Sequence, residues 1–188
     1  MLNTKKGRFL LLTFLIILGV MSRFVPHYPN FTAVGAVAIL SGRYFERKVF
    51  GYIIPLVIIW ISDLFLNHFI YPEYSSGWQS WIGDTWTYLG FGLTILIGSE
   101  LIRRVSTLSV IQSAIISSVV FFLISNFGVW SQGSMYPKDS IGLLAAYIAG
   151  IPYFWSSLLA NLIFSLIFFS GYEWLTQNRL LPIRVTSK

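Results

Sequence analysis

Cysteine is absent from the 188 residues, and charged residues are scarce, at 11%. Without cysteine there is no disulfide framework, no thiolate nucleophile and no thiolate-bound metal. A soluble domain of this size usually carries about 25% charged residues. Hydrophobic residues make up 55% of the chain and come in long runs, which a polar surface could not cover in water. We therefore expect an integral membrane protein that forms one compact domain over residues 1–188.

The net charge of +6 does not indicate nucleic-acid binding, because the basic residues sit between the apolar runs and form no contiguous patch. The chain also lacks a serine elbow, a zinc-protease HExxH motif and a GxxxxGK[ST] phosphate loop. Two histidines without cysteine make a poor metal site, so we expect no metal and no cofactor. Any ATP-driven activity would need a partner that hydrolyses the ATP.

The apolar runs predict an all-α membrane protein with six transmembrane helices, since one crossing needs about 20 mostly apolar residues. The last stretch, 141–175, is too long for one crossing. Pro152 is expected to divide it, because the residue before a proline is pushed out of helical geometry. Its first part, 141–150, is predicted to be a short re-entrant or interfacial helix. The six spans are expected at about 8–24, 31–45, 49–71, 85–102, 108–130 and 152–175.

The distribution of Lys and Arg predicts the orientation of the spans, because these residues concentrate in cytoplasmic loops. With the N-terminus inside, eleven of the 13 basic residues fall on the inner side, and only Arg23 and Lys138 fall outside. Both termini are therefore predicted to be cytoplasmic. A cleaved signal peptide is the alternative interpretation of the first span. It would leave five crossings and put the basic C-terminal tail on the wrong side.

Asp63 is the clearest candidate for a functional residue, because an ionisable side chain at membrane depth is costly. It lies toward the outer end of its predicted span, and Trp60 and Asn67 share its helix face at three- and four-residue spacing. Two interpretations stay open. Asp63 lines a ligand site, or it pairs with Arg23 or His27 and holds the bundle together.

Other polar and aromatic residues gather in the outer half and in the outer connections 23–30, 72–84 and 131–140. Asparagines there either contact a ligand or form hydrogen bonds between helices. The tryptophans either line a pocket or form an aromatic belt at the headgroup level. Together with the Asp63 face, the candidate ligand-binding residues are Arg23, His27, Asn30, Trp60, Asp63, Asn67, Asn126, Trp130 and Asn161.

Small residues in the second predicted span include Ala38 and Gly42, which are four apart and therefore share one helix face. Such faces let helices approach closely. The face either packs inside the bundle or docks a partner membrane protein.

Four segments of the sequence form a pattern: Arg23-Phe-Val-Pro-His-Tyr-Pro-Asn-Phe-Thr-Ala-Val-Gly-Ala36, Ser62-Asp63, Asn126-Phe-Gly-Val-Trp130 and Gly150-Ile-Pro-Tyr-Phe-Trp-Ser-Ser157. In this order they resemble an uncharacterised family of small bacterial integral membrane proteins. That family is similar in turn to the substrate-binding components of energy-coupling factor transporters, which import vitamins and related micronutrients.

The resemblance implies a bacterial inner-membrane protein with a ligand pocket built from outer loops and outer helix ends. It also implies a partner, a transmembrane coupling protein that carries two ATPase subunits. The sequence departs from the pattern, because the first span has no AxxxA-type docking face. Tyr28 and Ala33 stand where the family is expected to have proline, and Asn161 where it is expected to have an acid.

We therefore expect a substrate-binding subunit for the uptake of a small, vitamin-like molecule. A scaffold protein without a ligand and a stand-alone carrier are the alternatives. Catalysis is the least favoured function, since acid–base chemistry needs two groups in reach of each other. Asp63 with His27 or His68 is the one plausible pair.

Overall fold

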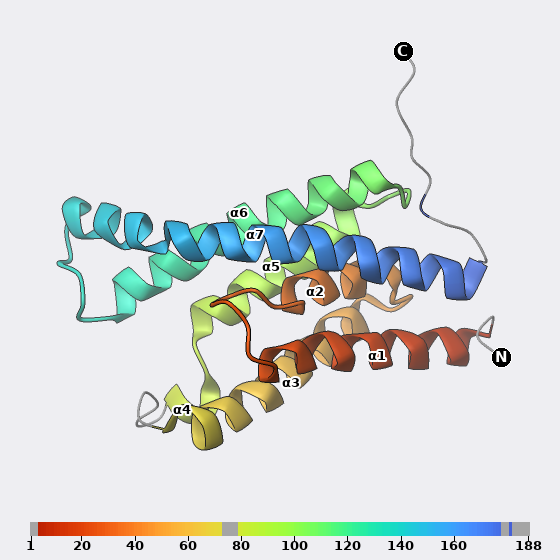
Figure 1. Cartoon of the computed structure of the whole chain (residues 1–188), viewed down its shortest axis with the longest axis horizontal. Coiled ribbons are helices and arrows are strands. Elements are labelled where there is room, and N and C mark those ends of the chain that lie inside the picture. Colours follow the sequence, from red (N-terminus) through yellow and green to blue (C-terminus); the bar gives the residue numbers. More distant parts are fainter. Residues whose placement is uncertain (1–3, 73–78, 178–180, 182–188) are drawn as a thin grey trace, which may run out of the picture.

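The computed structural model describes residues 4–72, 79–177 and 181, and in these ranges all regular structure is helical. The predicted all-α fold is confirmed for this part of the chain. The long helices lie side by side along one axis, and α1 begins at the end of the bundle where α7 finishes (Figure 1). The elements are α1 (Lys5–Met21), the 3-10 helix η1 (Ser22–Phe24), α2 (Val34–Tyr44), α3 (Lys48–Phe65), the π-helix η2 (Leu66–Ile70), α4 (Gln79–Ile82), α5 (Thr85–Leu101), α6 (Thr107–Gln132) and α7 (Ser140–Gln177).

Four helical segments are long and apolar enough to cross a membrane: α1 with η1, α3 with η2, α6, and α7. Their outward faces carry large apolar side chains, such as Phe14 at 59% exposure, Ile141 at 76% and Ile167 at 57%. Apolar surface on this scale is unfavourable in water and favourable in lipid. By length and composition, these four segments are candidate membrane spans.

The two ends of the bundle differ in charge. We call one of them the basic end. It is formed by the start of α1, the α2–α3 and α5–α6 connections and the last turn of α7. Two exposed ion pairs lie there, Lys5–Glu46 at 3.1 Å and Lys48–Glu100 at 2.8 Å. The tail residues Arg179, Arg184 and Lys188, which contribute to the predicted orientation, lie outside the described residues, as do residues 73–78 of one predicted outer connection.

The predicted second span, 31–45, is only partly helical, because α2 has 11 residues and begins at Val34. The Phe31 N–H donates to the Tyr28 carbonyl at 2.9 Å, and Asn30 has a positive φ of 63°, so a turn precedes the helix. At 1.5 Å per residue α2 is about 16 Å long, roughly half of a 30 Å hydrocarbon core. α5, with 17 residues, reaches about 25 Å. The expectation of six crossings therefore stays a prediction.

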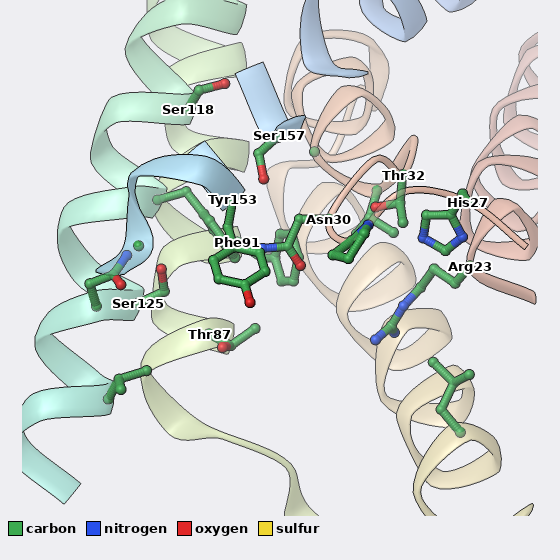
Figure 2. A pocket seen from close by; sticks show the side chains of 18 of the residues that line it. Arg23, His27, Asn30, Thr32, Thr87, Phe91, Ser118, Ser125, Tyr153 and Ser157 are labelled. Carbon is green, nitrogen blue, oxygen red and sulfur yellow. The ribbon is translucent and has the colours of Figure 1, made fainter. Parts of the chain in front are cut away.

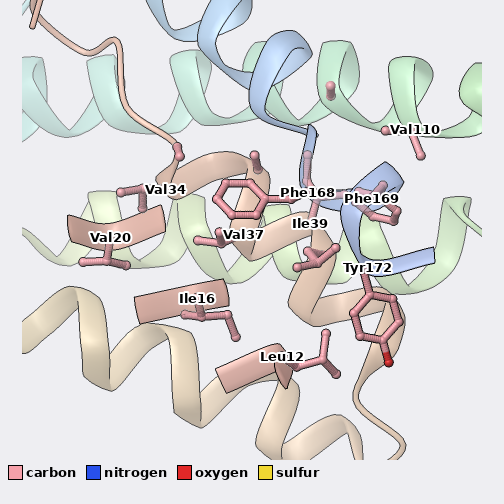
Figure 3. Close-up of a cluster of buried hydrophobic side chains, with 14 of the residues drawn as sticks. Leu12, Ile16, Val20, Val34, Val37, Ile39, Val110, Phe168, Phe169 and Tyr172 are labelled. Atoms are coloured by element: carbon pink, nitrogen blue, oxygen red, sulfur yellow. The ribbon is translucent and has the colours of Figure 1, made fainter. Parts of the chain in front are cut away.

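α2 lies at the centre of the bundle and contacts α1, α3, α5, α6 and α7. Its residues from Ala36 to Ser41 are all buried. Figure 3 shows Val37 and Ile39 of α2 in one buried cluster with Ile16 of α1 and Phe168 of α7. This short apolar helix therefore supplies the core around which the longer helices pack.

Small residues let the backbones of α2 and α5 come into direct contact. A Cβ added at Gly42 would overlap the Ile95 carbonyl oxygen, and one added at Gly98 would overlap the Ile39 carbonyl oxygen. Ala38 is fully buried as well. The face containing Ala38 and Gly42 is thus used for packing inside the bundle, which leaves no docking surface for a partner at these positions.

α7 is one helix of 38 residues with Pro152 inside it, so the predicted division into a short helix and a separate last span is wrong. Proline removes one N–H donor and crowds the carbonyl four residues earlier. The segment around Pro152 packs closely against α6. The Tyr147 hydroxyl donates to the Leu123 carbonyl at 2.9 Å, and Gly150 lies directly against the Asn126 side chain. Such neighbours make proline tolerable in membrane helices.

Candidate functional site

A cavity of about 1080 Å³ lies at the end of the bundle opposite the basic end. We call this end the cavity end. The cavity exists because α2 stops halfway, so that no helix fills the bundle axis beyond Val34. Residues 25–33 run along the cavity wall instead, and the remaining wall comes from η2 and from the facing halves of α5, α6 and α7 (Figure 2).

The wall combines cationic, amide, hydroxyl and aromatic side chains, and none of the described residues in it is Asp or Glu. It contains the guanidinium of Arg23 and the imidazole of His27. Its other polar and aromatic residues are Asn30, Asn126, Asn161, Thr32, Thr87, Thr94, Ser118, Ser125, Ser157, Phe24, Phe91, Phe121, Tyr71, Tyr136 and Tyr153. Polar groups at membrane depth need partners or water, so this wall is unlike a surface that faces lipid.

Asn161 joins three helices at the base of the cavity. It is 7% exposed, and its Nδ2 donates to the Ser118 hydroxyl of α6 at 2.9 Å. A Cβ added at Gly35 of α2 would overlap the Asn161 oxygen, so the amide lies on the first turn of α2. The interhelical interpretation of Asn161 is therefore seen in the structure, and the same side chain also lines the cavity.

Asp63 forms an ion pair beside the cavity, with its Oδ1 2.6 Å from Nη2 of Arg23. The Tyr88 hydroxyl donates to the other carboxylate oxygen at 2.5 Å, and Nη1 of Arg23 donates to the Ser62 hydroxyl at 2.5 Å. The side chains of Arg23 and Asp63 are 22% and 16% exposed. The network ties η1, α3 and α5 together. Of the two interpretations of Asp63, the structure therefore shows the pairing with Arg23. Asp63 is not among the residues that line the cavity.

Three further predicted site residues hold connections in place and do not line the cavity. The Trp60 indole N–H donates to the Trp81 carbonyl at 2.9 Å, and the Asn67 amide donates to the Ser80 carbonyl at 3.3 Å. Both bonds fasten α4 onto the α3–η2 segment. The Trp130 indole N–H donates to the Pro137 carbonyl at 2.8 Å and so fixes the α6–α7 connection.

The structure thus brings together five of the nine predicted residues, Arg23, His27, Asn30, Asn126 and Asn161. The nine predicted residues do not include the hydroxyl and phenyl groups beside them. One signal was present, because Thr87, Phe91 and Thr94 recur at four- and three-residue spacing and therefore share one face of α5. Tyr88 gave no comparable signal, since its partner Asp63 lies on another helix.

Comparison with protein families decides how the chain is classified. Residues 3–183 match a single family model along nearly the whole sequence. The chain belongs to DUF6580, a family of unknown function. No curated protein and no solved structure matches it. The expected membership of an uncharacterised family is confirmed, and the DUF6580 match spans every helix of the bundle and the whole cavity. The likeness to energy-coupling factor components stays a prediction.

Proposed function

We propose that this DUF6580 protein is a membrane-embedded substrate-binding subunit that captures a small, vitamin-like molecule for uptake. The observation that carries the proposal is the cavity itself, about 1080 Å³ with a polar and aromatic wall, inside a bundle of apolar helices. Small-molecule sites are typically concave spaces with apolar walls and a few well-placed polar groups. A scaffold without a ligand would have no need for such a space.

Three observations support an outward-facing cavity in a bacterial inner membrane. The described basic residues concentrate at the basic end, as in cytoplasmic loops. The cavity lies at the opposite end, so it would open outward with both termini inside. The resemblance to bacterial membrane proteins is consistent with this location. In the proposed topology α5 crosses the membrane, and α2 with residues 25–33 makes up the remaining crossing.

Uptake against a gradient needs energy, and the sequence contains no phosphate-binding loop. We therefore propose that a transmembrane coupling protein with ATPase subunits acts as the partner. Since Ala38 and Gly42 are used inside the bundle, that partner would bind elsewhere, on the outward faces of the longer helices.

Filling the cavity should remove ligand binding without unfolding the bundle. Ser157 lines the cavity from α7, and an indole in the Ser157→Trp variant would occupy space that a ligand needs. Leu159→Trp, on the exposed face of the same helix, is the matched control because Leu159 is 53% exposed. Native mass spectrometry of gently purified protein should show a retained small molecule in the unmodified chain and the control, and none in Ser157→Trp.

Melting temperatures of the three proteins would show that each is folded. Retention of the same molecule by Ser157→Trp would contradict binding in this cavity. A complete lack of retained molecules in the unmodified chain, across several mild detergents, would favour the scaffold alternative.

The proposed orientation can be measured directly because the chain has no native cysteine. Arg104 and Ser134 are exposed residues that lie beyond the two ends of α6. In intact spheroplasts a membrane-impermeant maleimide should label Ser134→Cys and should label Arg104→Cys only after permeabilisation. The reverse pattern would contradict an inward basic end, and labelling of both sites in intact spheroplasts would contradict a membrane-spanning α6.

A further inference from the structure

We infer that the molecule bound in this cavity is an organic anion whose negatively charged group lies beside Arg23 and His27. The inference rests on the proposed function and narrows it to one ligand class. Carboxylate and phosphate groups share the chemistry required, namely oxygen acceptors with negative charge. A cationic ligand is disfavoured, because none of the described residues in the wall is Asp or Glu.

Arg23 has more N–H donors than its contacts within the bundle use. A guanidinium has five N–H donors. The contacts described above use one donor on Nη1 for Ser62 and one on Nη2 for Asp63. Arg23 also lines the cavity, and the proposed ligand would bind to its remaining donors. The Asp63 pair fixes the guanidinium in position before any ligand arrives, which lowers the entropic cost of binding.

His27 is a second polar side chain that lines the cavity. Its Nδ1 lies 2.5 Å from the Val25 carbonyl oxygen, and this contact holds the ring in place. Figure 2 shows His27 and Arg23 on the same side of the cavity. The planar guanidinium of Arg23 suits the two oxygens of a carboxylate or phosphate group.

The N-terminal end of α2 adds positive electrostatic potential to that of Arg23. Val34 and Gly35 of its first turn line the cavity, and its N-cap residue, Ala33, has no side chain that could accept from that turn. The first N–H groups of a helix and its dipole favour negative charge nearby. This contribution reinforces Arg23 and His27 and would not define a site without them.

The opposite wall suits the uncharged part of the ligand. Phe91, Phe121 and Tyr153 offer aromatic faces from α5, α6 and α7. The Asn30 side chain points into the space between Tyr153 and Thr32 in Figure 2 and can donate or accept. An anionic group at one side with a planar or apolar body at the other fits this distribution.

The test uses the full-length protein in a neutral detergent and a lipid-free aqueous small-molecule extract of bacterial cells. Anion-exchange resin divides the extract into a retained, anionic fraction and a flow-through of neutral and cationic compounds. We expect the anionic fraction to raise the melting temperature of the unmodified chain and the flow-through to leave it unchanged. A third sample receives phosphatidylglycerol, because a lipid headgroup carries the same anionic chemistry.

Two variants and one control locate the effect. His27→Gln changes an exposed side chain and should fold normally. Arg23→Lys keeps a cation for Asp63 but loses the planar set of donors. Each should weaken the response about tenfold, measured as the concentration of anionic fraction needed for half of the melting shift. Lys5→Gln removes one exposed cation at the basic end and should respond as the unmodified chain does.

A melting shift caused by the flow-through would overturn the anion inference and leave the proposed function standing. Equal responses of His27→Gln, Arg23→Lys and the unmodified chain would overturn the assignment to these two residues. A response to phosphatidylglycerol alone, lost in both variants, would overturn the proposed uptake function and assign the cavity to lipid. No response to any sample would count against the cavity as a binding site and therefore against both proposals.

Discussion

Asp63→Asn is expected to lower the free energy of unfolding by about 3 kcal/mol. The substitution removes the counter-charge of Arg23, whose side chain is only 22% exposed. Leaving one member of a largely buried ion pair without its partner typically costs several kcal/mol, since the remaining charge is desolvated and uncompensated. Tyr88 would still find an acceptor in the new amide, so the loss should come mainly from the guanidinium. Thermal and denaturant unfolding in mild detergent would measure it.

Two controls separate this effect from the loss of charge in general. The double variant Arg23→Gln with Asp63→Asn removes both charges and should recover part of the lost stability, because no unpaired charge remains. Glu46→Gln breaks an exposed pair with Lys5 and should change stability little. If Asp63→Asn unfolded like the unmodified chain but lost its retained small molecule, the ligand-binding interpretation of Asp63 would replace the structural one.

Gly42→Ala is expected to have a comparable effect by a different mechanism. The added Cβ would overlap the Ile95 carbonyl oxygen of α5, and a backbone atom cannot turn away as a side chain can. Overpacking of a close contact typically costs about 1–3 kcal/mol. Gly98→Ala should behave alike, because its Cβ would overlap the Ile39 carbonyl oxygen of α2. Both variants should melt at lower temperature or accumulate poorly in membranes.

Gly92→Ala is the matched control on α5. A Cβ there would have no heavy atom within 4 Å, apart from its own helix and chain neighbours. Alanine inside a helix is favoured over glycine by about 0.5–1 kcal/mol, so this variant should be slightly more stable. If Gly42→Ala and Gly92→Ala had the same stability, the close packing of α2 on α5 would be wrong.

The helix pattern was largely predictable from the sequence because long apolar runs have few alternatives in a membrane. The predicted span 108–130 compares with α6 at Thr107–Gln132, and 49–71 compares with α3 and η2 together. The predicted helix boundaries were wrong where tertiary packing outweighed a local sequence preference. Pro152 disfavours a helix locally, yet contacts with α6 hold it inside α7. The start of α2 was misjudged because residues 31–33 lie between a turn at residues 28–31 and the first helical residue, Val34.

The site was predictable in part. Helical spacing placed Trp60, Asp63 and Asn67 on one face, but spacing cannot say what that face contacts. In the structure these residues hold neighbouring segments together, with Asp63 beside the cavity and the other two against α4. Arg23, His27 and Asn30 were found because they stand together in one short outer segment. Most of the wall hydroxyls were harder to single out, since Ser and Thr are common between membrane helices and only Thr87 and Thr94 recur at helical spacing with Phe91.

The half-length of α2 also gives the two ends of the bundle different mechanical properties. Toward the basic end the surrounding helices rest on a fully packed central helix, and such close-packed regions deform little. Toward the cavity end no central helix lies between them, and polar contacts such as Arg23–Asp63–Tyr88 and Asn161–Ser118 contribute to joining them. Local opening has the lowest free energy where buried apolar contacts are few. We therefore expect local opening to cost less free energy at the cavity end than around α2.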